Sequence, residues 1–235
     1  MYVITADQIG SRADIDRSEA MRLELQAEFG DRLALPVDQT AGDEVQAITA
    51  DPATALELIL ALHRAERWSI GLGIGDVREP LPDAVRKAAG PAFVAAREAV
   101  DAGKRADGRF ALRAADDRRG LLDAAQVEAL IRILLLLRDR RTPQGWEAVD
   151  LVRDGRTQKD AARLLGISDA AVSQRLRAAQ WNADGDAGPA LVRLLADLDG
   201  LPGRGPDDDT AARAATGSHD GDAPRSDAML DGRDR

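Results

Sequence analysis

The pattern of hydrophobic and polar positions divides the chain into an N-terminal part with strand and helix patterns and a C-terminal part with helix patterns alone. Short apolar runs in the first part are the right length for strands. Apolar positions three and four residues apart predict helices between them. The predicted strands are 2–6, 34–40, 45–50, 68–74 and 109–113, and the predicted helices are 16–29, 52–66 and 91–104.

Only helices are predicted beyond residue 120. An amphipathic helix over 121–140 either packs within its own chain or pairs with a second copy of itself. Helices are also expected at 146–152 and 189–198, on either side of a helix pair within 157–176. After Pro202 the chain is rich in Gly, Asp, Ala, Arg and Pro, so it has too little apolar surface to offset the entropy of ordering. This composition predicts a disordered tail.

These patterns predict an α+β protein with four regions. Residues 1–115 are expected to form an α/β domain and residues 116–141 a linker helix. Residues 142–200 are expected to form an all-α domain, in which the pair is preceded by one helix and followed by another, and residues 201–235 form the tail.

Residues 157–176 have the pattern of a helix-turn-helix. Thr157 and Ser168 are placed to cap two successive helices with their hydroxyl groups. Gly166 suits the left-handed residue that ends the first helix. Small and apolar residues recur on the faces that would pack together: Ala161, Ala162, Leu165, Ile167, Val172 and Leu176. The alternative is a helical hairpin that only packs.

The outer side of this pair predicts contacts with double-stranded DNA. A second helix lying in the major groove presents polar or small side chains to the edges of the bases. The candidate DNA-contacting residues are Thr157, Gln158, Ser168, Asp169, Ala170, Ser173, Gln174 and Arg177.

Charge restricts this function to one part of the chain. The 235 residues carry a net charge of −9, which argues against a protein that coats nucleic acid over its whole surface. Between Arg132 and Trp181, however, ten Arg and Lys residues outnumber six Asp and Glu residues. A basic segment that reads DNA within an acidic chain is therefore expected.

Composition excludes several other classes of site. The chain has no cysteine, so it has no disulfide and no thiolate metal site. Its two histidines are too few for a histidine-rich metal site. The N-terminal residues lack a signal-peptide pattern, and the longest apolar run, 133–137, is too short to span a membrane. A soluble cytoplasmic protein with no membrane partner is expected.

Three stretches of the first domain look like parts of one ligand site. Asp7 ends the first strand, and the backbone N–H groups of the following loop, at Gly10 and Ser11, can approach a phosphate. Asp43 follows Gly42 at a predicted hairpin tip, and two carboxylates from adjacent strands suit Mg²⁺.

Arg97 belongs to the third stretch. It follows Gly90-Pro91 on a predicted helix and can offer a planar fork to a phosphate. The glycines of 70–75 leave room for a close backbone approach along a strand. Each stretch also has a purely structural interpretation, in which the hairpin is only a turn, Asp7 is a cap and Arg97 pairs with a carboxylate.

Residues 1 to about 105 resemble the SatD family. The resemblance rests on the Asp-Gln-Ile-Gly-Ser start, the Gly-Asp-Glu hairpin, the Gly-Ile-Gly strand and the Gly-Pro-Ala…Ala-Arg-Glu-Ala helix. More remotely, the same order of motifs is similar to class III nucleotide cyclase domains. That similarity implies a ferredoxin-like α/β sandwich, and it implies that Asp7 and Asp43, with Glu44, ligate Mg²⁺ or Mn²⁺ while Arg97 contacts phosphate.

The chain departs from the cyclase pattern at Phe93, which occupies the position of a cyclase asparagine. A phenyl ring cannot hydrogen-bond to ribose or phosphate, and losing such a contact lowers a rate by about 10²–10³. We therefore expect a regulator whose N-terminal domain senses a nucleotide or phosphate ligand and which binds DNA as a homodimer. The alternatives are an active cyclase or nucleotide hydrolase with a C-terminal targeting module, and a structural interaction protein.

Overall fold

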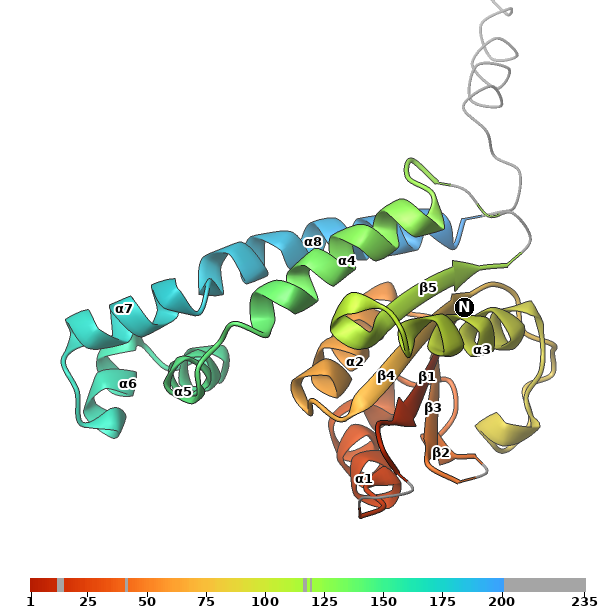
Figure 1. Ribbon diagram of the computed structural model, residues 1–235, viewed down its shortest axis with the longest axis horizontal. Coiled ribbons are helices and arrows are strands. Elements are labelled where there is room, and N and C mark those ends of the chain that lie inside the picture. The colour runs from red at the N-terminus through yellow and green to blue at the C-terminus, as the bar shows by residue number, and fades with distance from the viewer. Residues whose placement is uncertain (12–14, 41, 116–117, 119, 201–235) are drawn as a thin grey trace, which may run out of the picture. The chain divides into compact units, whose positions relative to one another are not determined.

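The computed structural model describes residues 1–200, apart from 12–14, 41, 116–117 and 119, and its described part is a mixed α+β structure (Figure 1). The expected tail therefore lies outside the described residues. One sheet contains β1 (Tyr2–Gln8), β2 (Asp38–Gln39), β3 (Glu44–Thr49), β4 (Trp68–Ile74) and β5 (Phe110–Ala114). The α-helices are α1 (Ser18–Phe29), α2 (Pro52–Arg64), α3 (Pro91–Gly103), α4 (Ala124–Arg138), α5 (Pro143–Arg153), α6 (Gln158–Leu165), α7 (Asp169–Ala178) and α8 (Trp181–Leu198).

The strand order is β2-β3-β1-β4-β5, and the β4–β5 pair is parallel while the others are antiparallel. Side chains alternate between the two faces of the sheet. Tyr2 and Ile4 of β1 belong to the core beneath α1 and α2, whereas Val3 packs with Ala92 and Ala96 of α3 on the opposite face. By the same alternation, Asp7 lies on the α3 face.

The two glycines inside β4 are required by α3. A Cβ at Gly71 would overlap with the backbone of Ala96 and Val100, and one at Gly73 would overlap with the backbone of Ala92 and Ala96. The space along this strand is therefore filled by the chain's own helix, which sits directly on the sheet.

Gly73→Ala should consequently destabilise the fold, because helix backbone rather than a flexible side chain would have to move. We expect the free energy of unfolding to fall by about 1–3 kcal/mol or more, the cost of overpacking. Gly185→Ala is the matched control, since nothing lies within 4 Å of a Cβ at that helical position. The control should gain about 0.5–1 kcal/mol. Urea denaturation followed by circular dichroism measures both, and equal stabilities would contradict this account of the packing.

Two predicted elements differ from the structure. The strand expected at 34–40 is reduced to β2, because Pro36 lacks an N–H for a ladder and Val37 donates its N–H to the side chain of Gln26 instead. The last helix begins at Trp181 rather than at Pro189, which lies inside α8. Because proline is a common first residue of a helix, the sequence pattern led us to place the start of this helix at Pro189.

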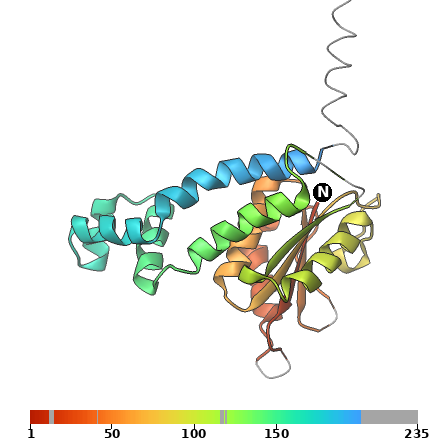
Figure 2. The same cartoon turned by 45° about the horizontal axis from the view of Figure 1, so that its top comes forward.

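α4 and α8 lie side by side in both views and join the same core as the sheet (Figures 1 and 2). Ile131 and Leu135 of α4 and Leu191, Leu195 and Leu198 of α8 are buried in this core. The helix predicted at 121–140 thus packs within its own chain on one face. Its opposite side exposes Leu130, Ile133 and Leu136.

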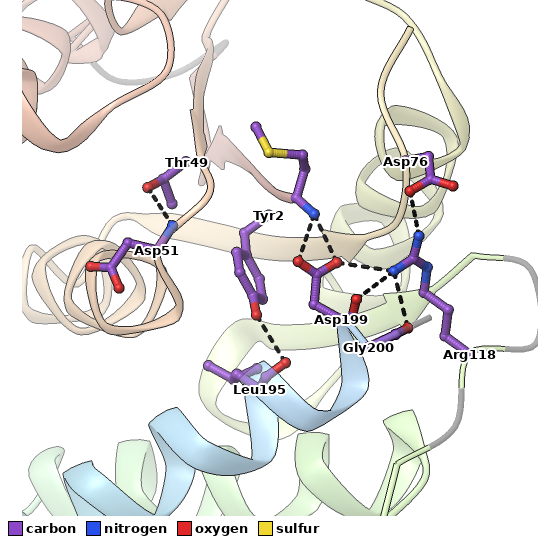
Figure 3. A network of polar contacts seen from close by, with 9 residues as sticks. Tyr2, Thr49, Asp51, Asp76, Arg118, Leu195, Asp199 and Gly200 are labelled. Carbon is purple, nitrogen blue, oxygen red and sulfur yellow. Dashed lines mark hydrogen bonds and ion pairs between the residues drawn. The ribbon is translucent and has the colours of Figure 1, made fainter. Parts of the chain in front are cut away.

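Polar contacts hold the end of α8 against the sheet (Figure 3). The Tyr2 hydroxyl donates to the Leu195 carbonyl at 3.0 Å, and burial raises the pKa of this phenol above its usual value. Arg118 donates to the carboxylate and carbonyl of Asp199 and to the carboxylate of Asp76. The amino group of Met1 pairs with Asp199 at 2.7 Å. None of the helices in the described residues is both long and apolar enough to cross a membrane.

α5, α6 and α7 form a second apolar cluster at one end of the α4–α8 pair (Figure 1). Buried arginines connect this cluster to the rest of the described structure. Arg138 Nη1 and Arg141 Nη2 donate to Asp184 at 2.9 and 2.6 Å, and the two side chains are only 8% and 1% exposed. The Trp146 ring stacks against the guanidinium groups of Arg64, Arg138 and Arg141. We call Arg138, Arg141, Trp146 and Asp184 the arginine joint.

Candidate functional site

The residues expected to bind a ligand gather at the C-terminal end of β1. A cavity of 670 Å³, which we call the β1 cavity, is lined by Asp7, Gln8, Gly10, Ser11, Asp16, Gly42, Asp43 and Lys104. β1 and the β2–β3 hairpin bring these segments together, and the Gln8 N–H donates to the Asp43 carbonyl at 3.2 Å. Gly10 and Gly42 have φ of 73° and 89°, a region that favours glycine.

Glu44 and Arg97 lie next to this cavity but are not part of its lining. Glu44 pairs with Asp7 in the sheet register, yet its Oε1 accepts bonds from Thr40 Oγ1 at 2.6 Å and Gln46 Nε2 at 3.0 Å. Arg97 approaches Glu44 only at 3.5 Å, and 66% of its side chain is exposed. The guanidinium is thus available to a ligand, while the Glu44 carboxylate is already hydrogen-bonded.

The acidic side chains at the β1 cavity suit a divalent cation held by two protein carboxylates better than a cation held by three. The described residues contain no group of three or more His, Cys, Asp or Glu side chains placed to hold a metal ion. Asp7 and Asp43 together still fit Mg²⁺, which takes one or two carboxylates and completes its shell with water and phosphate. The hydrogen bonds of the Glu44 carboxylate do not support its expected role as a third metal ligand.

Lys104 is a site residue that the sequence interpretation missed. Its Nζ lies 3.3 Å from Asp7 Oδ2 and 3.1 Å from Asp101 Oδ1. Partial burial alone would lower the pKa of Lys104, but these two carboxylates outweigh that effect and raise it. A signal was available, because Lys104 follows Arg97 by seven residues, two helical turns on the same face. The Lys104 ammonium group therefore lies at the cavity, where it could pair with an anionic ligand as well as with Asp7.

The second candidate site is the outer side of α6 and α7. Thr157 Oγ1 accepts from the Asp160 N–H at 3.1 Å, and Ser168 Oγ accepts from the Ala171 N–H at 3.2 Å. Gly166 has φ of 65°, and the buried residues include Ala161, Val172 and Leu176. The predicted caps, turn and inward face of this pair are confirmed.

The residues expected to contact DNA are all reachable by solvent on this pair. Ser173 is half-buried, and the rest are exposed: Thr157, Gln158, Ser168, Asp169, Ala170, Gln174 and Arg177. Val172 and Leu176 point inward, so helical geometry directs Gln174 and Arg177 outward. We call Ala170, Ser173, Gln174 and Arg177 the α7 face.

Positive charge is distributed unevenly over the pair. Arg163 pairs with Asp160 at 2.8 Å, and Arg175 pairs with Glu147 at 3.2 Å. Arg156, Lys159 and Arg177 are exposed and make no ion pair with any described residue. The surface beside the α7 face thus carries cations that are not already neutralised.

No family model matches the chain, and no curated protein is significantly similar to it.

Proposed function

We propose that this chain is a DNA-binding transcriptional regulator in which α6 and α7 form a helix-turn-helix and the α7 face contacts base edges. The observation that carries the proposal is the combination of a capped helix pair, an outward face of small and polar residues, and three exposed cations, Arg156, Lys159 and Arg177, that pair with none of the described residues. Phosphate contacts by such cations position a protein on DNA, while side chains in the major groove read the sequence.

The test is selection of bound duplexes from a random-sequence DNA pool with the full chain. Enriched sequences should share a motif and bind more tightly than scrambled duplexes of the same composition. Affinity should fall steeply with salt, since phosphate contacts release counterions. Failure to enrich any motif, together with no salt-dependent binding, would contradict the proposal.

We further propose that the N-terminal domain, residues 1–115, belongs with SatD proteins and senses a nucleotide or phosphate ligand. Its element order β-α-β-β-α-β, with strands ordered β2-β3-β1-β4, matches a ferredoxin-like sheet to which α3 and β5 are added. This topology supports the remote similarity to class III cyclases. Asp7 and Asp43 would hold a divalent cation, Gly10, Ser11 and Gly42 would approach the phosphates, and Lys104 and Arg97 would offset their charge.

Asp7→Asn should abolish stabilisation by nucleotide and Mg²⁺. A ligand that binds only the native state raises the melting temperature with its concentration. We expect ATP or GTP with Mg²⁺ or Mn²⁺ to do so in the parent chain and not in Asp7→Asn, as measured by differential scanning fluorimetry. Asp101→Asn is the control, because it also removes a carboxylate from Lys104 but does not line the β1 cavity. Equal shifts in both variants would remove Asp7 from the site.

A cyclase or hydrolase would use the same cavity, and the presence of Asp7 and Asp43 together with Lys104 in its lining is the observation that favours it. Phe93 argues against cyclase chemistry, because its ring packs partly buried beside Val3 and Ala92 rather than offering a polar group. Product formation from ATP or GTP with Mn²⁺, absent in Asp43→Ala, would establish the enzyme instead of the sensor.

The regulator is proposed to act as a homodimer. Helix-turn-helix proteins bind two half-sites with two copies of the motif. The exposed Leu130, Ile133 and Leu136 on the outer side of α4 are a surface on which a second copy could pack.

A further inference from the structure

The outer side of α4 carries the largest group of exposed apolar side chains in the described part of the chain. Leu130, Ile133 and Leu136 are exposed on this helix, and Leu121 lies just before it. The other large apolar residues that the described structure exposes occur singly, on α1, α3, α6 and the loop after β1. Single apolar residues are normal on a protein surface, whereas a group of them indicates an interaction surface.

This group belongs to a stripe with the spacing of a helix–helix seam. The stripe consists of exposed residues separated alternately by three and four positions: Gln126, Ala129, Ile133, Leu136 and Arg140. Such spacing lets two helices pack side by side along their length. The opposite side of α4 is buried in the core of its own chain, so the stripe, which we call the α4 stripe, remains open to a partner.

The two ends of the α4 stripe carry opposite charges. Asp123 is exposed at the N-terminal end, where its carboxylate accepts the N–H of Gln126. Arg140 is exposed at the C-terminal end and makes no ion pair with any described residue. An antiparallel copy of α4 would bring each Asp123 close to Arg140 of the other copy. A parallel copy would bring like charges together at both ends, which is unfavourable.

The sizes of the side chains favour the same orientation. If the two-fold axis passes beside Ile131, Ile133 of one copy faces Ala129 of the other. In the same register, Leu136 of one copy lies close to Ala125 of the other. Large side chains opposite small ones fill the space between two helices. A parallel pair would instead place Ala129 opposite Ala129 and leave a gap in that layer.

We propose that the α4 stripe packs antiparallel against the α4 stripe of a second copy of this chain. The proposal rests on the homodimer of the proposed function and gives it an interface and an orientation. The chain's own C-terminal segment is a poor alternative occupant, since Met229 and Leu230 are the only large apolar residues of 202–235. Because both copies use the same surface, the assembly closes at two.

The orientation determines where the two helix-turn-helix units lie. The α6–α7 pair lies beyond the C-terminal end of α4 (Figure 1). In an antiparallel pair these ends are at opposite ends of the seam, separated by about 22 Å, the length of a helix of 15 residues. Half-sites one turn of DNA apart have centres separated by about 34 Å. Selected duplexes should therefore contain two inverted copies of the motif with centres at least one turn apart.

Analytical ultracentrifugation of the full chain tests the interface without DNA. The parent should form a dimer, and Ile133→Glu should raise its dissociation constant at least tenfold, because a carboxylate would enter the apolar seam. Val94→Glu is the matched control, since Val94 is 61% exposed against 63% for Ile133 but lies on α3. Circular dichroism checks that both variants fold. A monomeric parent, or equal dimerisation of the two variants, would overturn the proposal.

Disulfide cross-linking tests the orientation, for which a chain without cysteine is well suited. Ala125→Cys and Leu136→Cys, mixed and oxidised, should form a dimer that contains one copy of each variant, identified by mass spectrometry. Neither variant should cross-link alone, because identical positions would lie about 15 Å or more apart along the helices. A disulfide joins Cα atoms within about 7 Å. Cross-linking of each variant alone, but not between the two, would indicate a parallel pair and overturn the proposal.

The failure of this interface and the failure of the proposed DNA binding give different results. A chain that dimerises through α4 but selects no DNA sequence contradicts only the regulator. A chain that selects a motif but remains monomeric, or dimerises equally well as Ile133→Glu, contradicts only the α4 interface.

Discussion

Asp184→Ala should lower the free energy of unfolding by about 3–5 kcal/mol, the cost of removing one partner from a buried ion pair. Asp184 accepts from Arg138 and Arg141, both of which are almost fully buried. Burial lowers the pKa of the Arg138 guanidinium and Asp184 acts against that shift, so its charge is desolvated and depends on this carboxylate. Without it, two buried cations would face each other with no counter-charge.

Guanidinium chloride denaturation followed by the fluorescence of Trp146 and the other tryptophans measures this loss. Asp186→Ala is the matched control, because Asp186 is exposed on the same helix and makes no ion pair with any described residue. Its stability should change by no more than about 0.5 kcal/mol. A loss for Asp184→Ala as small as for the control would mean that the two arginines are hydrated in solution.

A triple variant distinguishes the free energy lost when one partner of the arginine joint is removed from the net free energy that the intact joint contributes to stability. Replacing Asp184, Arg138 and Arg141 together by Leu, Met and Leu should recover most of the stability lost in Asp184→Ala, because no buried charge remains. Arg141 Nε also donates to the Ala179 carbonyl at 2.7 Å, so one backbone acceptor would lose its partner and recovery should be incomplete.

Local features were predictable from the sequence because they depend on neighbouring residues. The bounds of β4, the caps at Thr157 and Ser168 and the left-handed turn at Gly166 all follow from side-chain chemistry within a few positions. The association of Asp7 with Asp43 was also predictable, since a strand end and a hairpin tip of adjacent strands meet.

The long-range packing was not predictable in this way. The apolar stripe of Leu191, Leu195 and Leu198 indicates that one side of α8 is buried. It does not indicate that this side packs into the core beneath the β-sheet. Likewise, Gly71 and Gly73 indicate a close approach without identifying what approaches. Both answers depend on contacts between residues far apart in sequence, on which periodicity gives no information.

The arginine joint escaped the sequence interpretation for a related reason. Arg138 and Arg141 look like part of a basic surface that could face DNA, because arginines are mostly exposed. The structure buries them on Asp184, so they add nothing to the positive surface of the helix pair. Among the described residues of 156–178, the exposed cations without an ion pair are Arg156, Lys159 and Arg177, and these remain for phosphate contacts.

The double variant Gln174→Ala/Arg177→Ala should lose about 2–6 kcal/mol of binding free energy for its selected DNA sequence, since each good base contact is worth about 1–3 kcal/mol. Discrimination between the selected and scrambled duplexes should fall with it. Fluorescence anisotropy at several salt concentrations measures both quantities. Circular dichroism should be unchanged, because both side chains are exposed.

Two further variants separate base reading from charge. Lys159→Ala should weaken binding to selected and scrambled duplexes alike and reduce the slope of log affinity against log salt by about 1. Arg193→Ala removes the same charge from an exposed position on α8, outside the helix pair, and should leave the slope unchanged. If the double variant kept parental discrimination, the α7 face would not be the surface that reads DNA. Equal salt slopes for Lys159→Ala and Arg193→Ala would remove α6 from the phosphate contacts as well.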